Sequence, residues 1–251
     1  MQNWYFIYPF VEGNNVYGDE ITTQHAQHIG EFLAQMHAIK INQETFDDLS
    51  PPVVLNQNLD HWQIILEKAA QAEAQLQPLI VKLKPYILQT LSQLPIASQQ
   101  LTRKQVLSHR DLTPRNVLWQ SSDSFNVIDC EWLGPIHPEV ELLTAAMDWS
   151  WDGKRWAPPL FQAVIQGYCN RSAYILKEQF ESLLMMVLGH WYSWLGFNLQ
   201  KLIVGKDVAE IERDKSLKEI IYTLQAVEFI KDNDEILEKA WASRALQFKK
   251  G

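Results

Sequence analysis

The chain has 251 residues, 47% of them hydrophobic and 21% charged, a composition typical of a globular protein with one or two domains. Its formal net charge of −8 argues against a nucleic-acid partner and favours neutral or cationic small molecules. The two cysteines are too few and too far apart for a disulfide framework or a zinc knuckle. No apolar run reaches the roughly 18–20 residues of a membrane span, and the first residues show no signal-peptide pattern. We therefore expect a cytoplasmic protein without a membrane partner.

The first forty residues change from a β pattern to a helical one. Residues 4–11 form an apolar, β-rich run that ends in a turn at residues 12–15. A helix is then predicted behind Thr22 or Thr23 as N-cap. Its apolar residues recur at helical spacing, at Ile29, Phe32, Leu33, Met36 and Ile39.

The next segment predicts a loop followed by two helices. Residues 42–58 are typical of a loop because they contain a Pro-Pro pair and several Asn. Residues 59–76 and 79–94 predict helices that are separated by Pro78. Pro85 either kinks the second helix or marks its true start.

The central stretch carries the residues with the clearest chemistry. Two short apolar strands, at residues 117–119 and 127–128, flank a polar turn and predict a β-hairpin. Asp111, Asn116 and Asp129 stand immediately outside this hairpin, so their side chains are expected to converge. A carboxylate that accepts a hydroxyl proton, together with hard oxygen ligands, is the set that metal-assisted phosphoryl transfer needs.

The remainder of the chain is predicted to be helical, apart from a Trp-rich loop after Asp148. The longest apolar stretch runs through Trp191 and Trp194 and predicts the central helix of the domain. The expected helices cover residues 140–148, 160–169, 177–204, 208–231 and 234–248. The predicted fold class is therefore α+β and mostly helical.

One string in the central stretch resembles the catalytic loop of kinases. His109-Arg110-Asp111-Leu112, with Asn116 after three further residues, matches the pattern H-R-D-L-x-x-x-N letter for letter. A protein kinase would continue with Asp-Phe-Gly and later Ala-Pro-Glu, and neither string is present. Residues 128–143 instead resemble the "IDWE…GxPxxDLA" segment of the aminoglycoside phosphotransferase and choline kinase-like family.

Three further segments agree with this resemblance. Residues 8–13 look like the hinge between the two lobes of that family, and residues 30–37 look like its "LGxxLAxLH" helix. Residues 194–198 are similar to a "WLxxN" segment of some members. The sequence departs from the family pattern at Arg110, Cys130 and Glu141, where Gly, Trp and Asp are more usual.

The resemblance implies a protein-kinase-like carboxy-terminal lobe with a small β-hairpin at the active site. Residues 1–13 would be the hinge remnant of an amino-terminal β lobe that is otherwise largely absent, and residues 14–251 would form the helical lobe. The implied activity is transfer of the γ-phosphate of ATP or GTP to a hydroxyl of an aminoglycoside-like molecule or another amino alcohol. A rival interpretation is an inactive lobe that binds a small molecule or a partner, with possible self-association through the exposed hinge.

The resemblance also assigns roles to the residues around the hairpin. Asp111 would be the catalytic base, and Asn116 and Asp129 would hold Mg²⁺. The alternatives are a turn-capping role for Asp111 and strand-end hydrogen bonds for the other two. His109 is expected to support the loop rather than react, and Glu131 is expected to support the metal or substrate site.

Two more sets of residues complete the expected site. The nucleotide base would contact the hinge, at Tyr8, Pro9, Phe10 and Val11, unless this segment is a plain edge strand. The Trp-rich loop pairs carboxylates with aromatic faces, a combination suited to an amino or quaternary ammonium group, but it can equally be a loop folded onto the core. The candidate acceptor-binding residues are Asp148, Asp152, Trp191 and Trp194.

Overall fold

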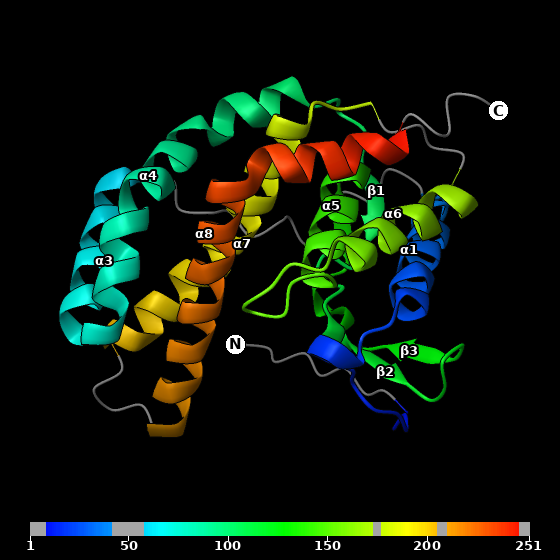
Figure 1. Ribbon diagram of the computed structural model, residues 1–251, viewed down its shortest axis with the longest axis horizontal. Helices are drawn as coiled ribbons and strands as arrows, with labels where there is room; N and C mark the ends of the chain where they lie inside the picture. Colours follow the sequence, from blue (N-terminus) through cyan, green and yellow to red (C-terminus); the bar gives the residue numbers. More distant parts are fainter. Residues whose placement is uncertain (1–8, 42–57, 173–176, 205–209, 246–251) are drawn as a thin grey trace.

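The computed structural model describes residues 9–41, 58–172, 177–204 and 210–245. These residues form a mostly helical α+β structure with two small sheets (Figure 1), as the sequence predicts. None of the helices in these ranges is long and apolar enough to cross a membrane. The longer helices are α1 (Thr23–His37), α3 (Leu59–Ala72), α4 (Gln77–Gln100), α5 (Pro138–Asp148), α6 (Pro158–Arg171), α7 (Phe180–Val204) and α8 (Glu210–Ala245).

Both sheets contain two antiparallel strands and lie next to the predicted site. The expected hairpin is formed by β2 (Val117–Trp119) and β3 (Phe125–Val127), with Val117 opposite Val127. A second pair was not expected from the sequence and joins β1 (Val106–Ser108) to β4 (Gly134–Ile136). This second pair brings the two ends of the central stretch together. The segment that contains the catalytic-loop motif therefore begins and ends on the same two-stranded sheet.

The amino-terminal segment differs from its prediction. Residues 4–8 of the expected strand lie outside the described residues, and residues 9–11 form no strand. The expected turn at residues 12–15 is instead an extended segment that pairs with β2. The backbone N–H and C=O of Asn14 both bond to Trp119, at 2.9 Å each. The segment therefore pairs with one edge of the hairpin at a single position, Asn14.

Helices α1 and α6 pack in direct backbone contact through two glycines. A Cβ built on Gly30 would lie 1.9 Å from the carbonyl oxygen of Val164, and one built on Gly167 would lie 2.0 Å from that of Gln27. No side chain larger than hydrogen fits at either position. This close approach fixes α1 against α6 and places His37, at the end of α1, beside the central stretch.

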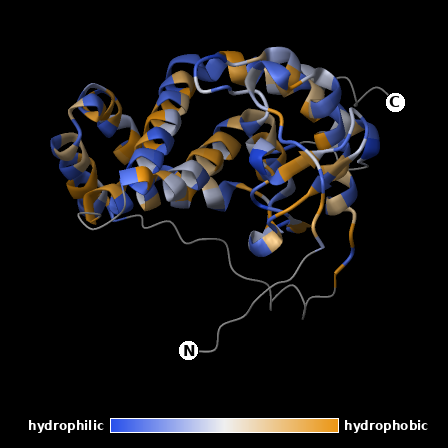
Figure 2. Ribbon diagram, turned by 90° about the horizontal axis from the view of Figure 1, so that it is seen from below, coloured by the Kyte–Doolittle hydropathy of each residue, from blue (hydrophilic) through white to orange (hydrophobic). Residues whose placement is uncertain are grey.

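The other helices form a hydrophobic core with α7 at its centre. Leu183, Val187, Leu188, Leu195 and Leu199 of α7 are completely buried, in agreement with the prediction of a central helix. Figure 2 shows that hydrophobic and hydrophilic residues alternate along the helices, the pattern that buries one face of a helix and exposes the other. The buried apolar residues of these helices form one hydrophobic cluster.

Helix α4 differs from its prediction, whereas α8 breaks where the sequence predicts. Helix α4 begins at Gln77, with Pro78 in its first turn, and runs through both Pro85 and Pro95 to Gln100. Pro85 therefore lies inside the helix, which curves over its length in Figure 1. In α8, Asn233 has non-helical backbone angles (φ −140°, ψ 21°), which is the break expected between residues 231 and 234.

The Trp-rich loop is folded onto the core, which was the second of the two interpretations of its sequence. Trp149 is completely buried, and its indole nitrogen donates a hydrogen bond of 2.8 Å to the carbonyl of Leu112. Trp151 and Trp156 face each other in an isolated antiparallel bridge, and Trp151 stacks on Phe229 of α8. The loop thus braces the residue that follows Asp111 in the chain.

Candidate active site

Asp111 and Asn116 are joined by two hydrogen bonds at the mouth of the β2–β3 hairpin. The amide nitrogen of Asn116 donates to the carboxylate Oδ2 of Asp111 at 2.7 Å and to its backbone carbonyl at 2.8 Å. Both bonds use the nitrogen, so the Oδ1 atom of Asn116 stays free to act as a ligand for a cation. Burial raises the pKa of Asp111, and the bond from Asn116 opposes that rise. The carboxylate is therefore held in a fixed position with increased basicity.

Asp129 is brought to the same place by the hairpin. The N–H of Ile128 bonds to the carbonyl of Asn116 at 2.9 Å, which sets the two predicted metal ligands at adjoining positions of the two strands' ends. Asp129 has a left-handed backbone (φ 63°, ψ 53°), a conformation that Asp tolerates better than most residues. Its charge also raises the pKa of Asp111, although less than burial does. The three polar residues outside the hairpin therefore converge as the sequence suggested.

The catalytic loop is fixed from below by Glu141 of α5. The carboxylate oxygen Oε1 of Glu141 accepts hydrogen bonds from the backbone N–H of Arg110 (2.9 Å) and the hydroxyl of Ser108 (3.0 Å). Glu141 is only 3% exposed, and this burial raises its pKa to about 7. The family usually has Asp at this position. The longer Glu141 side chain also forms hydrogen bonds to the loop.

Arg110, which replaces the more usual Gly, has a structural role. Its backbone is left-handed (φ 64°), a conformation that costs a non-glycine residue about 1–2 kcal/mol. The side chain is nearly buried, and its Nε donates to the carbonyl of Trp132. The guanidinium lies against Gly134, where an added Cβ would come within 2.7 Å of it. The Arg110 side chain therefore packs against the start of β4, and these contacts hold the residue in its left-handed conformation.

His109 and His37 hold the loop from two further sides. The Nε2 atom of His109 lies 2.9 Å from the carbonyl of Ile128, next to Asp129. His37 was not predicted as part of the site, yet its Nε2 lies 3.2 Å from the hydroxyl of Ser108. Its Nδ1 lies 2.9 Å from the hydroxyl of Tyr168, and burial lowers the pKa of His37 to about 3. A neutral His37 therefore links α6 to the strand that begins the catalytic loop.

Asp148 of α5, Trp191 and Trp194 of α7 and Glu219 of α8 lie on the side of the site opposite the catalytic loop, and we call this set the acceptor wall. Asp148 ends α5 beside Trp191 of α7, whose side chain hydrogen-bonds to it. Burial raises the pKa of Asp148 to about 8, and the nearby charge of Asp111 adds to the rise. Asp148 and Trp191, both candidate acceptor-binding residues, are therefore brought together within electrostatic reach of the candidate base.

Trp194 lies further along the same face of α7 and is 41% exposed. Its indole nitrogen donates to the carboxylate of Glu219 on α8 at 3.0 Å. Glu219 also pairs with Arg115 of the catalytic loop. Neither Glu219 nor Arg115 was identified from the sequence, because the two lie 104 positions apart and no local motif marks their contact.

Two other predicted residues lie apart from this wall or bind elsewhere. The carboxylate of Asp152 accepts hydrogen bonds from the backbone N–H groups of Lys154 (2.7 Å) and Arg155 (2.6 Å), so it caps its own turn. Its role in acceptor binding stays a prediction. Glu131 is exposed in the short 3-10 helix Cys130–Trp132 that follows Asp129.

The predicted nucleotide side is only partly described. Tyr8 lies outside the described residues. Pro9 and Phe10 are exposed, Phe10 to 90%, and Val11 is partly buried. Residues 9–11 are not an edge strand, and their exposure leaves them available for a ligand. Their role in nucleotide binding stays a prediction.

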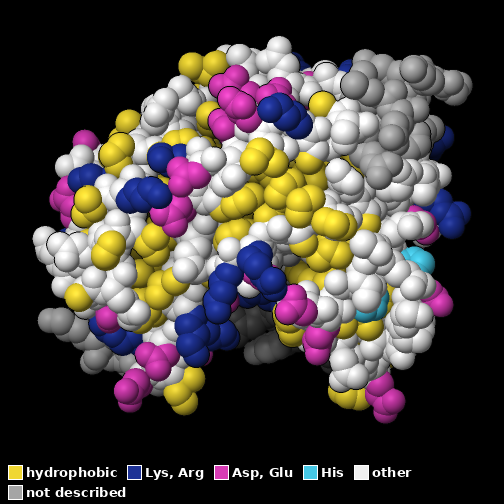
Figure 3. Space-filling view, viewed as in Figure 1, with side chains coloured by type: hydrophobic (Ala, Val, Ile, Leu, Met, Phe, Trp, Pro, Cys, Tyr) yellow, Lys and Arg dark blue, Asp and Glu magenta, His cyan; other side chains and the backbone are white. Residues whose placement is uncertain are grey.

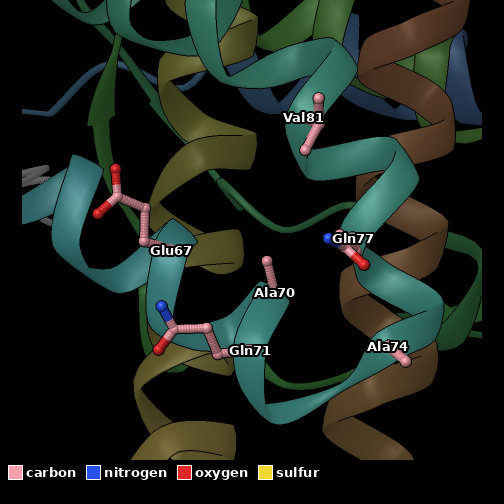
Figure 4. Close-up of a pocket in the computed structure, with 6 residues that line it drawn as sticks. All are labelled: Glu67, Ala70, Gln71, Ala74, Gln77 and Val81. Carbon is pink, nitrogen blue, oxygen red and sulfur yellow. The ribbon is translucent and has the colours of Figure 1, made fainter.

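Two recesses lie outside the catalytic loop. One, of about 450 Å³, lies between α3 and α4 (Figure 4) and is lined by Glu67, Ala70, Gln71, Ala74, Gln77 and Val81. The carboxylate of Glu67 is 2.8 Å from the ammonium of Lys84, so it already has a partner. The other, of about 310 Å³, lies between the Trp-rich loop and residues 18–21. Among the described residues, no group of three or more His, Cys, Asp or Glu side chains forms a metal site.

Three solved structures with a similar fold carry the names of phosphotransferases or kinases of small molecules. A spectinomycin phosphotransferase in complex with ADP and spectinomycin has a TM-score of 0.60 at 16% identity, over 88% of this chain and 70% of its own. Ethanolamine kinase from Plasmodium vivax has a TM-score of 0.57 at 13% identity, over 85% of this chain and 63% of its own. Choline kinase from Cryptosporidium parvum has a TM-score of 0.52 at 14% identity, over 92% and 73%.

These likenesses show the kinase-like fold, and the chain spans about two thirds of the length of the proteins compared. No curated protein sequence matches the chain. The model of the phosphotransferase enzyme family matches residues 2–174, which include the catalytic loop, Asp129 and α5. The resemblance drawn from the sequence is therefore confirmed, and the chain belongs to the phosphotransferase enzyme family.

Proposed function

We propose that the chain transfers the γ-phosphoryl group of ATP or GTP to a hydroxyl group of a small molecule. The observation that carries this proposal is the convergence of Asp111, Asn116 and Asp129 at the hairpin mouth. A positioned carboxylate beside two oxygen ligands is the arrangement that phosphoryl transfer requires. The family match supports the class of reaction, and the similar structures support the fold in which it takes place.

Asp111 is the proposed base. The acceptor hydroxyl hydrogen-bonds to its carboxylate and gives it a proton as the new P–O bond forms and the bond to the β-phosphate oxygen breaks. The raised pKa of Asp111 favours the acceptance of that proton. The hydrogen bonds from Asn116 hold the carboxylate in one orientation, so the base is positioned before the acceptor arrives.

The residues present fit a Mg²⁺ ion as the cofactor. The free Oδ1 atom of Asn116 and the carboxylate of Asp129 are hard oxygen ligands of the kind that Mg²⁺ prefers. Both amide hydrogens of Asn116 are directed at Asp111, which turns its oxygen to the other side. A bound Mg²⁺ would supply positive charge to the phosphate oxygens; Asn116 and Asp129 are the residues that would hold it.

The acceptor is proposed to be an amino alcohol or an aminoglycoside-like molecule that lies against the acceptor wall. Asp148 and Trp191 offer a carboxyl group and an indole face close to Asp111. Trp194 adds an exposed aromatic surface further out. An indole face attracts an ammonium group, and a carboxyl group with a raised pKa can accept a hydrogen bond from it. The nucleotide base is proposed to contact the segment from Tyr8 to Val11.

The test is a nucleotide turnover assay of the full chain with MgATP and MgGTP against a panel of amino alcohols and aminoglycosides. Turnover that depends on an acceptor and disappears in Asp111→Asn would support the proposal. Phosphorylated acceptor, identified by mass spectrometry, is the required product. Acceptor binding without nucleotide binding or turnover would contradict the proposal and favour the rival interpretation of a binding module. Self-association through the surface around Phe10 stays a prediction, which sedimentation velocity checks.

A further inference from the structure

An ion pair connects the catalytic loop to the acceptor wall. Arg115 stands between Asp111 and Asn116 in the loop, in the short 3-10 helix Pro114–Asn116. Its two terminal nitrogens lie 3.4 and 3.3 Å from the two carboxylate oxygens of Glu219 on α8. The Arg115 side chain is 48% exposed and that of Glu219 is 21% exposed. A charge of each sign is therefore partly exposed to solvent here, and Arg115 lies four positions after the candidate base in the chain.

The pair rests on an exposed aromatic surface formed by Trp194 and Phe197. These rings stack at 5.6 Å between centroids with an angle of 21°, and Phe197 is 55% exposed. The guanidinium of Arg115 lies 5.9 Å from the centroid of the Trp194 ring. The indole nitrogen of Trp194 holds the Glu219 carboxylate. Both members of the pair are thus oriented by the same tryptophan.

The contact between Arg115 and Glu219 is longer than a strong charge-assisted bond, which is about 2.7–2.9 Å. Other surface pairs of the chain reach that range, such as Lys82 with Glu228 at 2.7 Å and Lys84 with Glu67 at 2.8 Å. Because the pair is half exposed and loosely bonded, little stability is lost when a ligand replaces it. A ligand with both charges would exchange one loose pair for two new ones.

The charges around the pair are mostly acidic. Besides Glu219, the carboxyl groups of Asp111 and Asp148 act electrostatically on Arg115. Arg115 is therefore the group of this cluster that can bind an anionic part of an acceptor, and Glu219 can bind a cationic part.

We propose that Arg115 and Glu219 form a subsite for zwitterionic acceptors, in which Arg115 binds a carboxylate and Glu219 binds an ammonium group. The planar guanidinium fork matches a carboxylate with two parallel hydrogen bonds. The charge of Asp111 acts on Arg115, so an acceptor bound at this pair would lie within electrostatic reach of the candidate base. The preferred acceptors are hydroxylated amino acids rather than the amino alcohols that lack the carboxylate. This inference deepens the proposed function and rests on it.

The experiment compares acceptor pairs that differ only in the carboxylate. L-serine with ethanolamine, and L-homoserine with 3-aminopropanol, are titrated into the full chain by calorimetry in the presence of MgATP analogue, and then assayed as acceptors. The variants are Arg115→Gln, Arg115→Lys and Glu219→Gln. Lys82→Gln is the matched control, because it breaks a surface ion pair on α4 away from the site. Thermal melts establish that each variant is folded.

We expect the carboxylate-bearing member of at least one pair to bind at least about 10-fold more tightly, which corresponds to one strong charge-assisted contact. Arg115→Gln should remove that preference without weakening the amino alcohol, and Arg115→Lys should restore part of it. Glu219→Gln should weaken both members of the pair. Equal binding of both members to the unaltered chain, or a preference that survives Arg115→Gln, would overturn the subsite.

The two proposals fail separately. Transfer to amino alcohols that disappears in Asp111→Asn, without any carboxylate preference, would leave the kinase function standing and remove the subsite. A carboxylate preference that depends on Arg115, without phosphoryl transfer to any acceptor, would support the subsite and contradict the kinase function.

Discussion

The catalytic loop and the acceptor wall are built in different ways, although they face each other across one site. In the loop, the decisive contacts join residues that are close in the chain, such as Asn116 to Asp111 at a separation of 5 and His109 to Ile128 at 19. The wall meets the loop through a distant contact, since Glu219 of α8 pairs with Arg115 of the loop at a separation of 104. Figure 3 shows cationic, acidic and hydrophobic side chains gathered near the centre of one face of the molecule. Local sequence thus determines how the loop is arranged, whereas tertiary packing determines which side chains meet in the wall.

The largest expected effect is in the loop, at the candidate base. Asp111→Asn should reduce kcat by about 10³-fold, within the range known for loss of a general base. The backbone carbonyl of residue 111 still accepts a bond from Asn116, so the fold should persist. Single-turnover assays with the best acceptor, together with a thermal melt, measure both effects. A similar loss of activity from Trp194→Phe would break the distinction between loop and wall.

A second change in the loop concerns the candidate metal ligand. Asp129→Asn should lower the affinity for Mg²⁺ and reduce kcat/KM by about 100-fold, since a charged ligand is replaced by a neutral one. Asn tolerates the left-handed backbone at this position as Asp does, so strain does not confuse the result. Titration of activity with Mg²⁺ provides the measurement. An unchanged Mg²⁺ dependence would remove Asp129 from the proposed metal site.

The anchor between loop and helix can be tested through stability. Glu141→Ala should destabilise the chain by about 2–3 kcal/mol, because the N–H of Arg110 and the hydroxyl of Ser108 lose their acceptor in the interior. Glu141→Gln keeps an oxygen for both bonds and should cost less than about 1 kcal/mol. Urea unfolding at pH 7 compares the two variants. If Gln is as harmful as Ala, the negative charge rather than the hydrogen bonding holds the loop.

The smallest expected effect is a pH dependence in the wall. Asp148 has a pKa of about 8 in the folded chain and an ordinary value of 3.8 when unfolded. The folded state therefore binds more protons between these values, and stability falls as pH rises from about 4 to about 8. Asp148→Asn should remove the part of this decline that Asp148 causes.

Urea unfolding of the native chain and of Asp148→Asn at pH 5 and pH 8.5 provides the comparison. Glu141 contributes a decline of the same sign, since its pKa is also raised, to about 7, so a residual slope is expected in the variant. Parallel curves for the two proteins would show that Asp148 is ionised in the folded chain at neutral pH.

The sequence predicted the hairpin, the order of the helices and the place where α8 breaks, because each depends on local patterns of apolar residues, turns and caps. It missed the pairing of β1 with β4, since three-residue strands carry almost no periodic signal. It also took residues 12–15 for a turn, because the Gly-Asn-Asn string is typical of one and the partner strand lies a hundred residues away.

Site residues followed the same division. The positions around the hairpin could be found because their spacing forms a motif. His37, Arg115 and Glu219 could not, since each gains its role from a partner that only the tertiary fold supplies. Asp152 was predicted to bind the acceptor because of its aromatic neighbours. The backbone N–H groups of Lys154 and Arg155 donate to one of its carboxylate oxygens, a local contact that the sequence did not reveal.

Asn15 ties the amino-terminal segment to the catalytic loop. Its amide nitrogen lies within 3.2 Å of the carbonyl of Pro114 and 2.9 Å of those of Arg115 and Val117. Val11 lies four positions before Asn15, a span of at most about 14 Å when fully extended. A ligand bound to residues 9–11 would therefore lie near the catalytic loop. The hydrogen bonds of the Asn15 side chain limit how far the proposed nucleotide segment can move from the candidate base.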